Sequence, residues 1–212
     1  MALATNYIPN LKHPLYFLSL IGGVSLDEIK QTILDPDNPE KYMIEMHRLV
    51  LNTCVATGFG LGVIDVDIDS KNLSPIIKEL LLTITKFIFC EPVQFMDALC
   101  TLTGSGLAFI YFFINAMSEG GLKMGLNKNM AIKLVAKAMQ SAANSILESD
   151  KHPSELRDSV LSRGGPAIYG IDVLNKNNCD SGFQNAIEAS YRRLKELVNI
   201  EPIEEVEARP TL

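Results

Sequence analysis

A short continuous apolar stretch stands out near the start of the chain. It covers residues 15–21 and ends at Gly22-Gly23, and two further strand-like segments cover 46–52 and 86–90. A short apolar run without polar alternation is typical of a strand that is buried on both faces. The pattern therefore predicts a strand buried on both faces at 15–21, and strands at 46–52 and 86–90.

Helix start signals lie between these apolar stretches. Ser25 precedes a segment of helical periodicity over 26–34, and Ser74-Pro75 precedes another that runs to Leu82. Serine is a favoured N-cap, and proline is tolerated in the first helical turn. The segment 35–39 is rich in turn residues and predicts a loop. Strands and helices in this order predict about half of a doubly wound α/β sheet.

Acidic and apolar residues alternate from Val63 to Asp69. Asp65, Asp67 and Asp69 resemble the start of a calcium-binding loop, but Ser70 occupies the position that requires glycine. Strict alternation is typical of a strand with one polar and one apolar face. We therefore expect a solvated edge strand here and no calcium site.

The second half of the chain changes to helical spacing. Asn127 is placed to cap a long helix whose apolar residues recur three and four positions apart, and shorter helices are expected over 154–160 and 166–174. Ser181 is expected to cap the last helix. The pattern predicts an all-α region after the sheet.

Residues 98–118 contain no charged side chain and are long enough to span a bilayer. Thr101, Thr103, Ser105 and Asn115 interrupt this apolar stretch, and no Lys/Arg cluster flanks it. We therefore expect a helix that is buried between subunits, with a membrane span as the alternative.

Charge and cysteine content narrow the classes of function. A formal net charge of −6 and a pI near 5.1 argue against a nucleic-acid-binding surface. The four cysteines form no Cys-x-x-Cys pair, which argues against zinc and redox motifs and favours a reducing compartment. The N-terminal residues show no signal or transit peptide, so we expect a cytoplasmic protein, with mitochondrial location as the alternative.

Two other patterns are weak signals. Residues 58–62 read Gly-Phe-Gly-Leu-Gly, but a strand-like run follows them, whereas a dinucleotide-binding loop leads into a helix. We expect a loop between strands. His13, His47 and His152 have no partner at metal-ligand spacing, so no metal site is predicted and each is expected to be a surface or packing residue.

The strongest candidate site is the corner Ser162-Arg163-Gly164-Gly165-Pro166. A helix that begins after two glycines offers backbone N–H groups and the positive end of its dipole to a carboxylate or phosphate. A plain capping turn is the alternative. Upstream, the glycines of Gly104-Ser105-Gly106 allow helices to approach closely, or Ser105 simply caps a helix.

Several segments together resemble the pyrroline-5-carboxylate reductase family. The resemblance rests on the stretches 48–53, 102–106, 121–126, 152–158 and 188–197. Among them, Gly121-Leu-Lys-Met-Gly125-Leu126 is similar to the family's Gly-Val-Lys-Met-Gly-Leu. The order and spacing of these stretches make the resemblance specific over almost the whole chain.

The resemblance implies a domain plan. The family has a Rossmann domain followed by a helical dimerisation domain, so we expect an α/β fold followed by an all-α region. The expected parts are a partial Rossmann-like domain at 1–92, a helical dimerisation and substrate domain at 93–200, and an acidic tail at 201–212. The family's first strands and phosphate loop have no counterpart in the printed sequence.

The resemblance also implies an activity. The family reduces 1-pyrroline-5-carboxylate to L-proline with NADPH or NADH, and the cofactor carries the hydride. Carried over by motif, Ser162, Gly164 and Gly165 bind the substrate carboxylate, while Asn52 and Thr53 lie near the nicotinamide.

The candidate substrate site departs from the family pattern. Ala167 stands where the family has a threonine that reaches the ring nitrogen of the substrate, and Pro166 removes a backbone N–H. Arg163 stands where the family has proline, and its charge can partly replace the lost donor. Loss of two substrate hydrogen bonds would cost about 2–4 kcal/mol of transition-state binding.

Two functions of different class follow from these features. The first is an NAD(P)H-dependent reductase. The second is a non-catalytic relative that dimerises with itself or with a full-length reductase. A membrane-associated protein using residues 98–118 is a third hypothesis. The expected partners are a second copy of the chain, as a homodimer or higher oligomer, and a small-molecule substrate.

Overall fold

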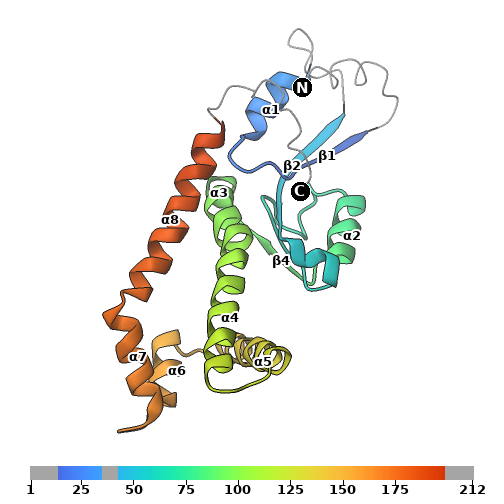
Figure 1. Cartoon of the computed structure of the whole chain (residues 1–212). Helices are drawn as coiled ribbons and strands as arrows, with labels where there is room; N and C mark the ends of the chain where they lie inside the picture. The colour runs from blue at the N-terminus through green and yellow to red at the C-terminus, as the bar shows by residue number, and fades with distance from the viewer. Residues whose placement is uncertain (1–13, 35–42, 199–212) are drawn as a thin grey trace, which may run out of the picture. The chain divides into compact units, whose positions relative to one another are not determined.

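The computed structural model describes residues 14–34 and 43–198 (Figure 1). The predicted loop at 35–39 and the predicted acidic tail at 201–212 lie outside the described residues, as does His13. The chain divides into two compact units. Unit 1 contains the described residues up to Gly106 and from Ile187 onward, and unit 2 contains residues 107–186.

Unit 1 is built on a mixed four-stranded sheet. Its strands β1 (Leu15–Ser19), β2 (Ile44–Leu51), β3 (Leu61–Ile64) and β4 (Phe87–Cys90) lie in this order across the sheet. β1 is parallel to β2, and β3 is parallel to β4, whereas β2 and β3 are antiparallel. The expected fold class, a sheet region followed by helices, is confirmed.

The core of unit 1 lies on both faces of the two central strands. Leu49 on β2 is paired with Ile64 on β3, and Val50 is paired with Val63. Because successive side chains of a strand point to opposite faces, the two pairs enter different clusters. The first packs with residues of α2 (Pro75–Ile84), and the second packs with Met96 at the start of α3 (Met96–Cys100).

Local signals fix where the first helices begin. The Ser25 hydroxyl accepts the N–H of Glu28 at 3.1 Å, and the Glu28 carboxylate accepts the N–H of Ser25 at 2.8 Å, which closes a capping box on α1 (Leu26–Ile33). Ser74 caps α2 through the N–H of Ile76. Both predicted caps are confirmed.

The predicted acidic edge strand at Val63–Asp69 is wrong in two respects. β3 ends at Ile64, and it is an interior strand that pairs with both β2 and β4. Asp65 follows the strand and is held by the fold, because its carboxylate accepts the N–H of Arg48 at 3.0 Å and lies 3.0 Å from Nδ1 of His47. The alternating residues after Ile64 therefore belong to a turn that holds the Asp65 carboxylate in place, and they do not form the polar face of a strand.

Helices fill the rest of the chain. After α3, the helix continues through a π-helical turn, η5 (Thr101–Ser105), into α4 (Gly106–Lys123). The remaining helices are α5 (Lys128–Leu147), α6 (Pro153–Val160), α7 (Pro166–Lys176) and α8 (Cys179–Val198). The alternative interpretation of Ser105 as a helix cap is therefore wrong, since this residue lies inside a continuous helix.

Two glycines and Asn127 determine how α5 follows α4. Gly125 has a φ of 90°, a backbone conformation that favours glycine, and a Cβ added at Gly121 would lie 3.2 Å from Cβ of Ala131. The Asn127 side chain then accepts the N–H of Asn129 at 3.0 Å, which confirms the predicted cap of α5.

The predicted cap of the last helix is wrong. α8 begins at Cys179, two residues before Ser181, and Asn178 precedes it with a φ of 51°. Asparagine tolerates this left-handed conformation, which ends α7 and redirects the chain. His152 is the cap of α6, because its Nδ1 accepts the N–H of Ser154 at 3.2 Å.

Candidate active site

The corner that sequence reasoning singled out is a tight turn in unit 2. Gly165 donates its N–H to the carbonyl of Ser162 at 2.8 Å, and Gly164 has a φ of 72°. A Cβ added at Gly165 would lie 2.2 Å from Oγ of Ser162. Both glycines are therefore required by the turn, and the serine hydroxyl lies against the backbone at the start of α7.

The first turn of α7 is open to a ligand. Gly165 is its N-cap and supplies no capping side chain, while Pro166 at the first position has no N–H to donate. Within the described part of the chain, the N–H of Ala167 has no hydrogen-bond acceptor. Ala167 is half-buried, whereas Ser162 and Arg163 are exposed. The corner thus presents a hydroxyl, backbone donors and a nearby guanidinium.

Asn52 and Thr53 lie in unit 1, directly after β2. The Asn52 side-chain oxygen accepts the N–H of Leu61 at 3.1 Å, and the Asn52 N–H donates to the Leu61 carbonyl at 3.2 Å. Asn52 therefore closes the connection between β2 and β3, and its side-chain NH2 is the group left to face a ligand. Thr53 is exposed at the start of the 3₁₀ helix η3 (Thr53–Thr57).

Sequence reasoning missed a second loop at the same sheet edge. Leu20–Val24 follows β1, and Asn52 follows β2, and these two strands are parallel neighbours. Ligands of open α/β sheets bind outside the carboxyl ends of parallel strands. The signal that could have revealed this loop was Gly22-Gly23, which had been taken only as the end of a strand.

Sequence reasoning also missed Asp97, a buried carboxylate on α3. Its Oδ1 accepts hydrogen bonds from Nη2 of Arg48 at 2.6 Å and from the N–H of Gly23 at 3.0 Å, and its Oδ2 accepts one from Nζ of Lys195. Burial by itself raises the pKa of Asp97. The hydrogen bonds from Lys195, Arg48 and Gly23 outweigh burial and lower this pKa to about 2, so the carboxylate is charged.

Two further titratable groups respond to Asp97. The hydrogen bond from Lys195 to Asp97 raises the pKa of that lysine. Burial, and then the negative charge of Asp97, raise the pKa of the Cys100 thiol. Cys100 is therefore a neutral thiol in the fold and not an activated nucleophile.

The predicted site residues belong to different units. Asn52 and Thr53 lie in unit 1, and the corner from Ser162 to Ala167 lies in unit 2. Neither group contains a metal-ligand cluster, and the described residues as a whole hold no group of three His, Cys, Asp or Glu side chains suited to a metal ion.

Comparison with known proteins identifies the family. The sequence model described as pyrroline-5-carboxylate reductase dimerisation matches residues 94–197, from just before α3 to the end of α8. A Bos taurus protein named pyrroline-5-carboxylate reductase 2 is 38% identical over 120 residues, which cover 56% of this chain and 38% of that protein. The chain belongs to the pyrroline-5-carboxylate reductase family.

Other pyrroline-5-carboxylate reductases extend the similarity over most of the chain. The Synechocystis protein of that name is 31% identical over 182 residues, covering 85% of this chain and 64% of that protein. The crystal structure of Plasmodium falciparum pyrroline carboxylate reductase with NADP bound shares the fold, with a TM-score of 0.77 and 23% identity over 92% of this chain and 76% of that one. This chain spans less than two thirds of the length of the Bos taurus and Synechocystis proteins.

Among the described residues, neither α1 nor the glycine-rich stretch 58–62 has the form of the pyrophosphate site expected from the pyrroline-5-carboxylate reductase family. α1 follows a parallel strand, but its capping box satisfies the end of the helix, and Asp27 and Glu28 place negative charge there. Residues 58–62 lead into β3 and not into a helix, as predicted. Neither place offers a free helix N-terminus to a pyrophosphate. The loops after β1 and β2, in contrast, lie outside the carboxyl ends of parallel strands, where ligands of open α/β sheets bind.

Proposed function

We propose that the protein acts as a pyrroline-5-carboxylate reductase, which reduces 1-pyrroline-5-carboxylate to L-proline with NADPH or NADH. Family membership and the geometry of the Ser162–Gly165 corner support this proposal. A tight turn that places a hydroxyl beside the open end of a helix is suited to a small carboxylate.

Each site residue has a distinct proposed role. The Ser162 hydroxyl and the backbone of Gly164 and Gly165 form the cradle of the substrate carboxylate, and the exposed Arg163 adds a positive charge. The N–H of Gly165 already donates to the Ser162 carbonyl. Binding of the carboxylate therefore depends on the other backbone donors of the corner, which include the N–H of Ala167. Bound NAD(P)H supplies the hydride.

The nicotinamide end of the cofactor is proposed to lie at the carboxyl ends of β1 and β2. There the Asn52 side-chain oxygen accepts the N–H of Leu61, and the Asn52 NH2 group is left to face a ligand. Thr53 adds an exposed hydroxyl. In this proposal these groups orient the nicotinamide ring.

A non-catalytic role is the second candidate. It is favoured by Ala167, whose methyl side chain cannot donate to the substrate nitrogen. In this role the chain is a dimerisation partner of itself or of a full-length reductase that supplies the cofactor site.

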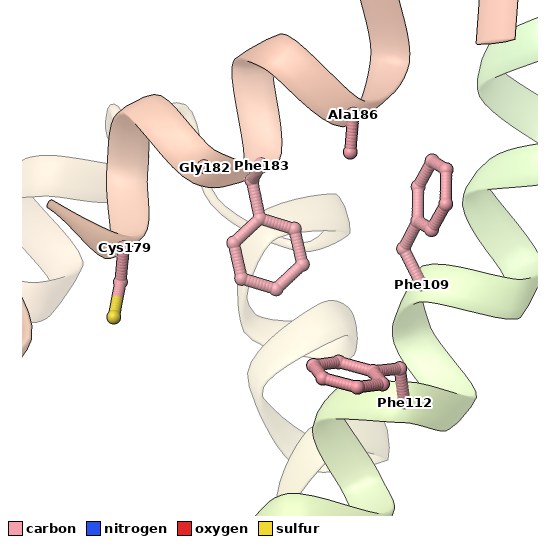
Figure 2. Close-up of a pocket in the computed structure, with 6 residues that line it drawn as sticks. All are labelled: Phe109, Phe112, Cys179, Gly182, Phe183 and Ala186. Atoms are coloured by element: carbon pink, nitrogen blue, oxygen red, sulfur yellow. The ribbon is translucent and has the colours of Figure 1, made fainter. Parts of the chain in front are cut away.

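Homo-oligomerisation through the helices is part of both candidates. In unit 2, a hollow of about 430 Å³ lies between α4 and the start of α8, and Figure 2 shows the rings of Phe109, Phe112 and Phe183 around it. Phe112 is 74% exposed within the single chain, and Leu134 on α5 is 56% exposed. Apolar surface of this extent is typical of a subunit interface.

A membrane role competes for the same apolar surface. Val93–Lys123 is long and apolar enough to cross a bilayer by length and composition. Asp97 lies within this run, and it is buried and paired with Arg48 in unit 1. A subunit interface accounts for the apolar residues that follow, and it agrees with the match to a dimerisation family.

The test is cofactor binding and turnover by the purified chain. Calorimetry measures binding of NADPH and NADH, and oxidation of the cofactor is followed on addition of pyrroline-5-carboxylate. Binding with turnover supports the reductase. The partner role is supported instead if the chain is a folded oligomer that binds neither cofactor, and if it changes the turnover of a full-length reductase when the two proteins are mixed. Recovery of the chain only in the membrane fraction contradicts both.

A further inference from the structure

The loop Leu20–Val24 is held in place by three other elements of unit 1. Arg48 on β2 donates from Nη2 to the carbonyl of Ile21 at 3.5 Å, and Asp97 on α3 accepts the N–H of Gly23. From α8, Leu194 covers the loop so closely that a Cβ at Gly22 would lie 2.6 Å from its Cδ1. The loop therefore has little conformational freedom of its own.

The carboxylate of Asp97 binds both the loop and the C-terminal end of α8. Its Oδ1 binds Gly23 and Arg48, while its Oδ2 binds Lys195. Asp97 is buried and the Lys195 side chain is half-exposed. Loss of the lysine would leave the carboxylate open to water on the side of α8, and would release the neighbouring Leu194 from Gly22.

The loop has the position of a ligand-facing segment. It follows the carboxyl end of β1, next to the segment that follows β2, and Leu20 and Ile21 are 60% and 55% exposed. Gly23 has a φ of 84°, so the loop adopts a shape that only a glycine accommodates without strain. If the proposed function holds, this loop lies beside the nicotinamide.

We infer that Asp97 is a positioning residue that couples the C-terminal end of α8 to the ligand-facing loop Leu20–Val24. Lys195 binds Asp97, and Asp97 binds the loop at Gly23, so the docking of α8 controls the shape of the loop through this carboxylate. The part of this inference that concerns the nicotinamide rests on the proposed function, whereas the coupling itself does not.

The decisive variant is Lys195→Gln, which removes the charge and keeps a side chain of similar length. Amide hydrogen exchange of the full chain is measured for the peptide that contains residues 20–25. We expect exchange there to rise about fivefold or more. The matched control is Arg192→Gln on the same helix. The exposed Arg192 forms an ion pair with the exposed Glu188, and exchange at 20–25 is expected to be unchanged in this variant.

Three results would overturn the inference. In the first, Lys195→Gln raises exchange at the end of α8 but not in residues 20–25. In the second, Arg192→Gln has the same effect as Lys195→Gln. In the third, exchange rises equally in β3, which would indicate general destabilisation. Asp97→Asn is the second variant, and it is expected to raise exchange in both segments, provided that its circular dichroism shows a folded chain.

Cofactor affinity separates the coupling from the proposed function. If the wild-type chain binds NADPH, Lys195→Gln is expected to weaken binding about fivefold or more, while Arg192→Gln leaves it unchanged. If the wild-type chain binds neither NADPH nor NADH, the proposed reductase fails, and the exchange measurements still decide whether α8 and the loop are coupled.

Discussion

Units 1 and 2 use apolar residues in opposite ways. Among the described residues, every buried hydrophobic side chain except Ala131 lies in unit 1, where the sheet is covered on both faces. Unit 2 consists of helices whose large apolar side chains are mostly exposed, including Phe112, Leu134 and Tyr169. Unit 1 therefore completes a core within one chain, whereas unit 2 requires a second surface to cover it.

The polar residues differ in the same way. In unit 1, Arg48, Asp97 and His47 are buried, and each has a charged partner within the unit. In unit 2, the corner at Ser162–Gly165 keeps its donors near the surface. Buried ion pairs fix the shape of the sheet region, while open donors suit a helical region that binds a small ligand or a partner.

The largest expected effect comes from a charge on the exposed face of unit 2. Phe112→Glu should abolish the oligomer, because a carboxylate would be buried without a partner at an apolar interface, and the dissociation constant should rise at least about 100-fold. Analytical ultracentrifugation measures this change. The matched control is Phe59→Glu in unit 1, where Phe59 is 64% exposed. Equal effects of the two variants would remove the proposed difference between the units.

A core truncation tests the same comparison from the other side. Leu81 is fully buried under the sheet, so Leu81→Ala should lower the free energy of unfolding by about 2–5 kcal/mol. Leu134→Ala in unit 2, made in the Phe112→Glu background, should cost less than about 0.5 kcal/mol because the residue is exposed in the single chain. Urea denaturation measures both. A large loss of unfolding free energy for Leu134→Ala in the monomer would contradict the proposed difference between the two units.

Acid should weaken unit 1 through Asp97. Its pKa is about 2 in the fold, against an ordinary value of 3.8, so its contribution is present above about pH 3.8 and is lost as the pH falls towards 2. The contribution at neutral pH is about 2 kcal/mol. Urea denaturation from about pH 6 to about pH 3 measures the fall. Asp97→Asn should be less stable at pH 6 and should fall less on acidification, unlike the exposed control Asp150→Asn.

The smallest effect concerns the corner of unit 2. If the chain is a reductase, Ala167→Thr restores a hydroxyl beside the cradle and should raise kcat/KM for pyrroline-5-carboxylate about tenfold, which corresponds to one hydrogen bond. Steady-state kinetics measures it, with Ala167→Val as the control of similar shape without a hydroxyl. An equal response to valine and threonine would show that the hydroxyl has no role.

Most elements of the fold were predictable because their signals are local. Ser25, Ser74 and Asn127 cap their helices as expected, and the apolar runs form strands near their predicted places. The errors at Ser181 and at Asp65–Asp69 have a common cause. Short-range patterns do not reveal which carboxylates and turn residues are fixed by neighbours that are distant in the chain.

The candidate site was predictable only where its chemistry lies in consecutive residues. The corner at Ser162–Gly165 is such a case, since two adjacent glycines and a serine form one turn. Asp97 could not be predicted in this way, because a single acidic residue before an apolar helix carries no local signal. Its partners Gly23, Arg48 and Lys195 are brought to it by three other elements.

By itself, the sequence determined most of the helices and strands and the glycine corner, since each depends on residues within a few positions of one another. It also determined the resemblance to a reductase family, which rests on the order of several such stretches along the chain. Only the tertiary structure decided that β3 is an interior strand and that the loop after β1, α3 and α8 meet at one carboxylate. It also decided that the apolar residues of unit 2 are left exposed. Burial and long-range ion pairs depend on which elements pack together, and that is a property of the whole fold.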